Sequence, residues 1–139
     1  MRRRSSARCS RAAEAPFHNA PYRVKLAHAY HLQHAGSISE AAKIFDEIAA
    51  ANRKALLAGA DWPIVFMENA AVHALRGQSP AVLDELDRAY AAGWRDGRTL
   101  AVDPLFTSVR AEPRFRQLLS RIEADVAAMR ARADYSGLP

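Results

Sequence analysis

The sequence predicts an all-α protein of antiparallel helical hairpins, and three observations support this fold class. Apolar residues recur every three or four positions along five segments, which is the spacing of one face of a helix. Glycines separate several of these segments, as expected near the ends of consecutive helices. No segment shows sustained alternation of apolar and polar positions with β-branched residues, so strands are not expected.

The first hairpin is expected to pair a helix over residues 22–34 with one over residues 41–55. Gly36 lies between them. Ser37 and Glu40 have the spacing of a capping box, in which each side chain accepts a hydrogen bond from the backbone N–H of the other residue. This spacing predicts that the second helix starts directly after Gly36.

The second hairpin is expected over residues 64–75 and 82–89. An acidic residue and a proline at residues 61–63 precede its first helix, and Ser-Pro at residues 79–80 follows Gly77 and precedes its second helix. A side-chain oxygen followed by proline in the first turn is typical of a helix start. The order of glycine, start signal and apolar stripe therefore occurs in both hairpins.

Two copies of one phrase follow, Asp-Pro-Leu-Phe at residues 103–106 and Glu-Pro-Arg-Phe at residues 112–115. In each copy a carboxylate stands where it can meet unpaired backbone N–H groups, and proline occupies the first helical position. We expect a short helix at residues 104–109 and a long last helix whose apolar stripe continues to Met129. The preceding residues 94–102 are predicted to form a looser link.

The chain divides into a basic tail at residues 1–20, one helical domain at residues 21–132 and a flexible C-terminus at residues 133–139. Residues 1–23 hold six arginines and one acidic residue, which accounts for the whole net charge of +5. The tail is predicted to be disordered. The alternative is that its arginines associate with nucleic acid, although they lack interleaved aromatic residues.

Targeting signals are not apparent in the sequence. The basic start has no apolar stretch of the length that a secretory signal needs behind it, and no segment has the length of a membrane span. A single cysteine, Cys9, excludes an internal disulfide and favours a reducing compartment. We therefore expect a cytoplasmic protein with no membrane span.

No residue pattern points to catalysis, a metal or a cofactor. His28, His31 and His34 lie three apart, so their rings fall back around the helix and do not converge on one ion. Cys9 has no structured neighbour that could activate its thiol, and no glycine-rich phosphate loop is present. We expect a protein that is not an enzyme and that has no metal site and no cofactor.

Two charged clusters are interpreted as surface. The carboxylates of Asp84, Glu85 and Asp87 are expected on a solvated helix face with Arg88. The arginines at residues 114–121 could suggest a DNA-recognition helix, but acidic residues flank them. The sequence therefore argues against nucleic acid as a partner of the folded domain.

The two hairpins resemble each other when Gly36 is aligned with Gly77. Small and bulky apolar positions then coincide: Ala29 with Ala70, Ala41 with Val82, Phe45 with Leu86 and Ile48 with Ala89. This register resembles the tetratricopeptide repeat, in which small residues let helices cross closely and a bulky one fills the space against the next repeat. The period from Gly36 to Gly77 is 41 residues, longer than the ~34 of that repeat. We expect the extra length in the second helix.

Residues 89–119, with a Gly93-Trp94 turn and the two proline phrases, are similar to the terminal unit of many bacterial tetratricopeptide proteins. The resemblance covers residues 20–130. It implies a short solenoid of helical hairpins with a long C-terminal capping helix, acting as a protein–protein interaction module or adaptor. The alternative is the C-terminal regulatory or assembly segment of a larger bacterial protein, such as a cyclase, a sulfatase-like enzyme or a transcription regulator.

In the tetratricopeptide family the first helix of each hairpin lines a concave groove that binds a protein or peptide. The resemblance implies a groove for an apolar peptide or helix, with Met67 and Ala71 as core residues in the alternative interpretation. The groove candidates are Arg23, Leu26, Tyr30, His34, Ile64, Met67, Ala71 and Leu75.

A second surface is expected on the last helix. Val126 and Met129 continue its apolar stripe past the point that the short 104–109 helix could reach. We expect a homodimer that buries both residues near a two-fold axis. The alternative is that the last helix lies across the 41–55 helix and shields them within one chain.

Overall fold

The computed structural model describes residues 19–133, with side chains from residue 24 onward. This part of the chain contains helices and no strand, which confirms the all-α prediction. Most of the predicted tail, including Cys9, and the last six residues lie outside the described residues. The elements in order are α2 (Asn19–His34), α3 (Ile38–Leu57), α4 (Pro63–Leu75), α5 (Ser79–Ala91), α6 (Gly97–Val102), the 3-10 turn η1 (Pro104–Phe106) and α7 (Pro113–Arg132).

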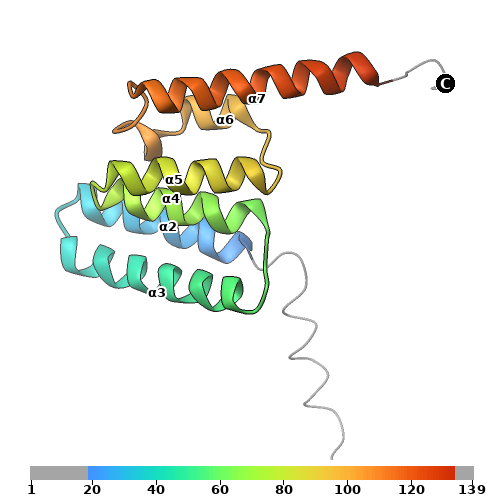
Figure 1. The fold of residues 1–139 in the computed structure, drawn as a ribbon. Helices are drawn as coiled ribbons and strands as arrows, with labels where there is room; N and C mark the ends of the chain where they lie inside the picture. Colours follow the sequence, from blue (N-terminus) through green and yellow to red (C-terminus); the bar gives the residue numbers. More distant parts are fainter. Residues whose placement is uncertain (1–18, 134–139) are drawn as a thin grey trace, which may run out of the picture.

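The helices form two hairpins, α2–α3 and α4–α5, that stack on one another (Figure 1). Helix α4 contacts both helices of the first hairpin as well as its own partner α5. The following elements continue the stack, since η1 packs on α4, and α7 packs on α5 and α6. Helix α3 therefore lies at one end of the stack and α7 at the other (Figure 1).

The two hairpin turns are built alike around glycines with left-handed backbone. Gly36 has a φ of 88° and Gly77 a φ of 73°, a region that residues with a Cβ rarely adopt. After Gly36, the N–H of Ser37 donates to the carbonyl of Leu32 at 2.9 Å, and the N–H of Gln78 after Gly77 donates equivalently at 2.9 Å. These bonds satisfy carbonyls that the helix end would leave unpaired.

The predicted capping box does not form. Ser37 occupies the N-cap position of α3, but its side chain makes no capping hydrogen bond. Its backbone has a ψ of 59°, outside the extended region that aims an N-cap side chain at the first turn. The N–H of Ser37 is already used by Leu32 in the preceding turn, so the Glu40 side chain has no vacant donor to accept from. The prediction that α3 starts directly after Gly36 is therefore confirmed, but the capping box from which it was made is absent.

Equivalent positions of the two hairpins are buried alike. Ala29 and Ala70 are both 0% exposed, and Phe45 and Leu86 both lie in the core at 4% and 1%. Small residues at the first pair of positions let the helices approach closely, and the bulky pair fills the space beyond them. Helix α3 has 20 residues and α5 has 13, so the extra length of the first hairpin does lie in its second helix.

The segment predicted as a loose link contains a short helix instead. The side chain of Asp96 accepts hydrogen bonds from the N–H of Thr99 at 3.0 Å and from its hydroxyl at 2.7 Å, and α6 begins at the next residue. A helix of six residues is too short to show an apolar stripe, which is why periodicity missed it. The predicted 104–109 helix is correspondingly shorter and consists of η1, capped by Asp103.

Helix α7 closes the stack through one apolar face. Phe115, Leu118 and Ile122 are all 2% exposed or less. Polar contacts add to this face, since the hydroxyl of Tyr90 on α5 donates to the carboxylate of Asp125 at 2.6 Å. The guanidinium groups of Arg95 and Arg121 lie 4.3 and 4.6 Å from the centre of the same Tyr90 ring.

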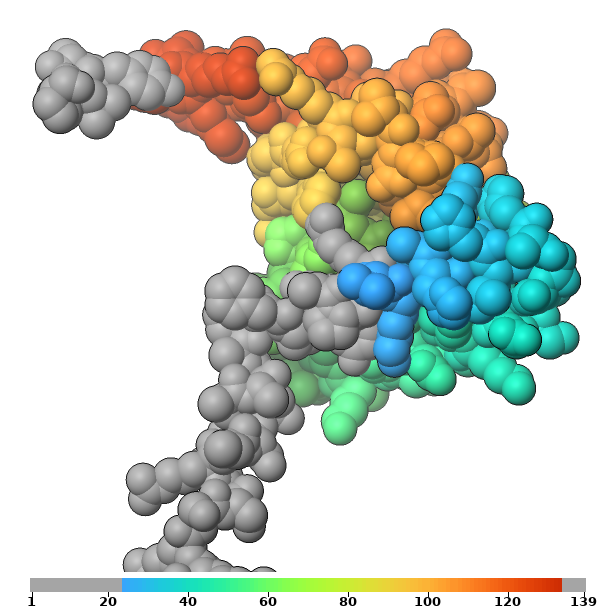
Figure 2. Space-filling view, turned by 180° about the vertical axis from the view of Figure 1, so that it is seen from behind, coloured from blue at the N-terminus to red at the C-terminus, as the bar shows by residue number. Residues whose placement is uncertain are grey.

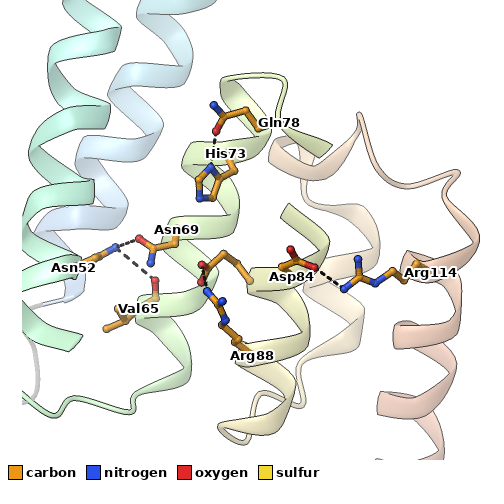
Figure 3. A network of polar contacts seen from close by, with 9 residues as sticks. Asn52, Val65, Asn69, His73, Gln78, Asp84, Arg88 and Arg114 are labelled. Atoms are coloured by element: carbon orange, nitrogen blue, oxygen red, sulfur yellow. Dashed lines mark hydrogen bonds and ion pairs between the residues drawn. The ribbon is translucent and has the colours of Figure 1, made fainter. Parts of the chain in front are cut away.

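Two of the carboxylates predicted on a solvated face, Asp84 and Asp87, have side chains that are 58% and 40% exposed, and they also form ion pairs with α7. Arg114 donates to Asp84 at 2.8 Å (Figure 3) and also to Asp87 at 2.7 Å. These hydrogen bonds, first that of Asp84, raise the pKa of the Arg114 guanidinium. Glu85 does not lie on the predicted solvated face, since it is only 8% exposed, and Arg88 donates to it at 2.6 Å. The interpretation missed the partner because α7 lies far along the sequence.

One buried polar contact links the two hairpins. Asn52 of α3 is 3% exposed, and its amide donates to the side-chain oxygen of Asn69 on α4 at 3.0 Å (Figure 3). The same amide lies 3.5 Å from the carbonyl of Val65, at the limit of a hydrogen bond. A buried amide needs such partners, so this pair helps to fix how the first hairpin sits against α4.

Candidate functional site

A pocket of about 400 Å³ opens between α2, α4 and the segment from α6 to η1. In Figure 2 the surface of α4 is visible between α2 below and the α6–η1 segment above. The volume lies within the range of ligand pockets, ~300 to 1,000 Å³. The first helices of both hairpins thus share a hollow with the elements that follow the second hairpin.

Most of the described lining is apolar. Helix α4 supplies the floor through Met67 and Ala71, which are 8% and 2% exposed. Helix α2 contributes Leu26 and the half-buried ring of Tyr30. Phe106 closes the opposite wall from η1. Such a surface favours apolar groups that leave water on binding.

The shortness of α6 and η1 explains why space remains. Helix α6 packs on α7 and η1 packs on α4. The two elements therefore occupy the position that the first helix of a third hairpin would take, with α7 as its second helix. The two elements are six and three residues long and are separated by Asp103. They cover the end of α4 less completely than a helix of thirteen residues, the length of α4 itself, would.

Charged groups in the described lining are acidic. Glu68 lies in the floor at 2% exposure, and the half-buried Asp103 lies at the rim. One carboxylate oxygen of Asp103 accepts from the N–H of Leu105 at 2.9 Å. His31, Thr99 and Trp94 complete the polar part of the wall. The described lining includes no lysine or arginine.

The structure brings five of the eight groove candidates together around this pocket. These are Leu26, Tyr30, Ile64, Met67 and Ala71. Met67 and Ala71 are also buried in the core, so each is both a core residue and part of the pocket lining.

Three groove candidates are not among the described lining. The side chain of Arg23 lies outside the described part of the structure. His34 is exposed, with its Nδ1 2.9 Å from the carbonyl of Tyr30. Leu75 is half-buried against the core, and its carbonyl accepts from the side chain of Gln33 at 2.8 Å. Helical register therefore indicates part of the pocket lining but does not show where the pocket ends.

Sequence reasoning missed the wall that α6 and η1 provide. Trp94, Leu100, Leu105 and Phe106 line the pocket, whereas the motif at residues 103–106 was interpreted as a helix start with an inward-packing phenylalanine and not as part of a binding surface. The Gly93-Trp94 turn was the available signal, because a tryptophan can bury a large area against neighbouring elements.

A second hollow of about 710 Å³ lies between α6 and α7. Val126 lines it and is half-buried, while Met129 is 46% exposed and Val102 of α6 is 73% exposed. Helix α7 packs on α5 and α6 at the opposite end of the stack from α3 (Figure 1). The expected alternative, shielding of α7 by the 41–55 helix, is therefore not the arrangement found.

The described residues contain no group of three or more histidine, cysteine or carboxylate side chains placed to hold a metal ion. His28 and His31 are both exposed. No helix in the described ranges is long and apolar enough to cross a membrane.

Comparisons with known proteins return no relative. No family model matches the chain, and no curated protein and no solved structure matches it.

Proposed function

We propose that this chain is a helical-repeat module of the tetratricopeptide kind, which binds an apolar segment of a partner protein in the pocket between α2, α4 and η1. The single observation that carries the proposal is the shared apolar lining contributed by the first helices of both hairpins, Leu26 from one and Met67 from the other. A surface assembled from two repeats is how such arrays make a binding groove.

Repetition within the chain supports the assignment to this class. Ala41 and Val82 are 1% and 0% exposed, and Ile48 and Ala89 are both 0% exposed. These pairs are related by the same 41-residue shift that relates Gly36 to Gly77. The two hairpins thus use one packing scheme, and the α6–α7 unit provides the third layer that a short array needs.

The proposed activity is recognition without catalysis, as expected of a cytoplasmic bacterial adaptor. Its groove needs only apolar walls and a few polar groups for orientation. The same groove would serve a regulatory or assembly segment of a larger bacterial protein equally well. We further propose that Val126 and Met129 take part in self-association, because Met129 and Val102 leave apolar surface exposed beside the hollow between α6 and α7.

Tryptophan fluorescence provides the test of the groove. The chain has two tryptophans, and only Trp94 lines the pocket. In a Trp62→Phe background, a ligand that enters the pocket shifts Trp94 emission to shorter wavelength by excluding water. The probe is a display library of random decapeptides, from which binders to the immobilised protein are selected.

A matched pair of variants separates pocket binding from general adhesion. Ala27 is an exposed pocket residue of α2, so Ala27→Arg places a bulky group at the rim with little effect on folding. Ala42 is exposed on α3 and does not line the pocket, so Ala42→Arg adds the same side chain elsewhere. Selected peptides should lose binding with Ala27→Arg and keep it with Ala42→Arg. Equal binding to both variants would refute the proposed groove.

A further inference from the structure

The C-terminal half of α7 presents a surface that the rest of the stack does not cover. The last turns of this helix project beyond α5 and α6 (Figure 1; Figure 2). Val126 and Ala127 line the hollow of about 710 Å³ between α6 and α7, and Val102 on the α6 side of the same hollow is 73% exposed. Exposed apolar surface that continues across two elements is typical of a site of association.

One acidic and one basic side chain flank the apolar pair on α7. Glu123 precedes Val126 by three residues, and Arg130 follows Ala127 by three. The two charged residues are therefore seven positions apart, about two helical turns, which returns both to one face of the helix. Both are exposed, and both line the hollow together with Val126 and Ala127.

Neither of these charges is used in an ion pair with a described residue. The ion pairs among residues 24–133 involve other side chains. Arg98 of α6, which is exposed and lines the same hollow, is likewise absent from those pairs. The surface thus presents positive and negative charge that its own described residues do not neutralise, which suits a partner that also carries both signs.

The order of the charges along α7 makes this surface complementary to itself. In a two-fold contact the same patch lies on both copies, and each pair of facing residues occurs twice. Two α7 helices that run antiparallel, with the axis between Val126 and Ala127, place Glu123 of each copy opposite Arg130 of the other. A parallel contact would place like charges opposite each other at both positions, which is unfavourable.

We propose that the occupant of this surface is a second copy of the chain, with its α7 antiparallel to the first, and that Glu123 and Arg130 select this arrangement. The inference deepens the proposed self-association and rests on it, since it specifies how the two copies meet. Val126 and Ala127 lose water at the centre of the contact, and two symmetric ion pairs lie beside them. A segment of a different protein is the other occupant, which the experiment distinguishes.

Charge reversal in the full chain tests the arrangement. Glu123→Arg leaves arginine at both of the paired positions, and Arg130→Glu leaves glutamate at both, so each variant should repel its own copy. The dissociation constant of either homodimer should rise at least about tenfold above that of the wild type, which corresponds to ~1.4 kcal/mol. Sedimentation equilibrium measures this increase, which should be smaller at high salt because both side chains are exposed.

Two combinations of the same substitutions should restore the contact. A mixture of the two single variants should form a heterodimer, because every arginine then meets a glutamate, and native mass spectrometry separates this species from the homodimers by mass. The double variant Glu123→Arg/Arg130→Glu should form a homodimer again, since it has the wild-type pattern with the signs exchanged.

Arg132→Glu is the matched control for Arg130→Glu. Arg132 is exposed in the same last turn of α7 but does not line the hollow. This variant therefore has the same cost at the helix C-terminus and should leave the dissociation constant within about twofold of the wild type. Circular dichroism checks that every variant is folded.

The possible failures separate this arrangement from self-association in general. A wild type that is monomeric at high concentration would overturn both and leave the surface to a different protein. A dimer that is lost with Val126→Asp/Met129→Asp but is indifferent to charge reversal would overturn the antiparallel arrangement alone. Weakening by both single variants without a heterodimer in their mixture would overturn the direct contact between Glu123 and Arg130.

Discussion

Leu118 and Leu57 offer a matched test of how the last helix is held. Leu118 on α7 is 2% exposed, whereas Leu57 at the end of α3 is 84% exposed. Truncation to alanine removes the same atoms at both sites. Only at Leu118 do those atoms fill space inside the core, so only there should the loss leave a cavity.

The expected magnitudes follow from this difference in burial. Leu118→Ala should lower the free energy of unfolding by ~3 kcal/mol, within the range of about 2 to 5 kcal/mol for a buried leucine. Leu57→Ala should change it by less than ~0.5 kcal/mol. With an m-value of ~1.5 kcal/mol per molar urea, the midpoint for Leu118→Ala should fall by about 2 M.

Urea titrations followed by far-UV circular dichroism measure both variants. A loss below ~1 kcal/mol for Leu118→Ala, or equal losses for the two variants, would refute the placement of α7 against the core. A reduced m-value for Leu118→Ala would show in addition that α7 unfolds separately from the rest of the stack.

The remaining predictions concern the turns, the surface charges and the oligomeric state. Gly77→Ala should destabilise the fold by ~1 kcal/mol because its φ of 73° disfavours a Cβ, and a thermal melt that shows no loss would contradict this turn geometry. Arg114→Ala should lower the free energy of unfolding by less than ~1 kcal/mol, since the side chains of Arg114, Asp84 and Asp87 are all at least 40% exposed. This loss should be smaller at high salt, and urea titrations at two salt concentrations measure both effects. The double variant Val126→Asp/Met129→Asp should convert a dimer into a folded monomer in sedimentation, and a wild type that is already monomeric at high concentration would rule out this interface.

The repeated hairpins could be predicted because their signals are local. In each hairpin the glycine and the apolar stripe lie within a short window, and the second hairpin repeats them, so that Ala29 aligns with Ala70. The structure has the glycines in turns and both alanines in the core. The side-chain capping role predicted for Ser37, in contrast, is wrong. Its backbone N–H was already engaged by the preceding turn, and sequence spacing does not show that competition.

The pocket could be predicted only in part. The lining residues on α2 and α4 could be predicted from helical register. The wall formed by α6 and η1 could not, because it depends on how the chain returns after α5. Hydrophobic periodicity does not reveal two kinds of contact. The side chain of Asp96 caps the start of α6, and Arg114 forms salt bridges to α5. Residues separated by 30 positions, such as Asp84 and Arg114, become neighbours only once the whole stack is assembled.

The position of α6 and η1 next to the terminal helix α7 of the stack has a consequence for regulation. Contacts in the stack run from each element to its near neighbours, so the end of the array can open without unfolding the hairpins. One wall of the pocket belongs to that end. For the proposed peptide-binding function, affinity would therefore be coupled to the local opening equilibrium of the last helices, and a bound peptide should slow amide hydrogen exchange in α6 and α7 as well as in α4.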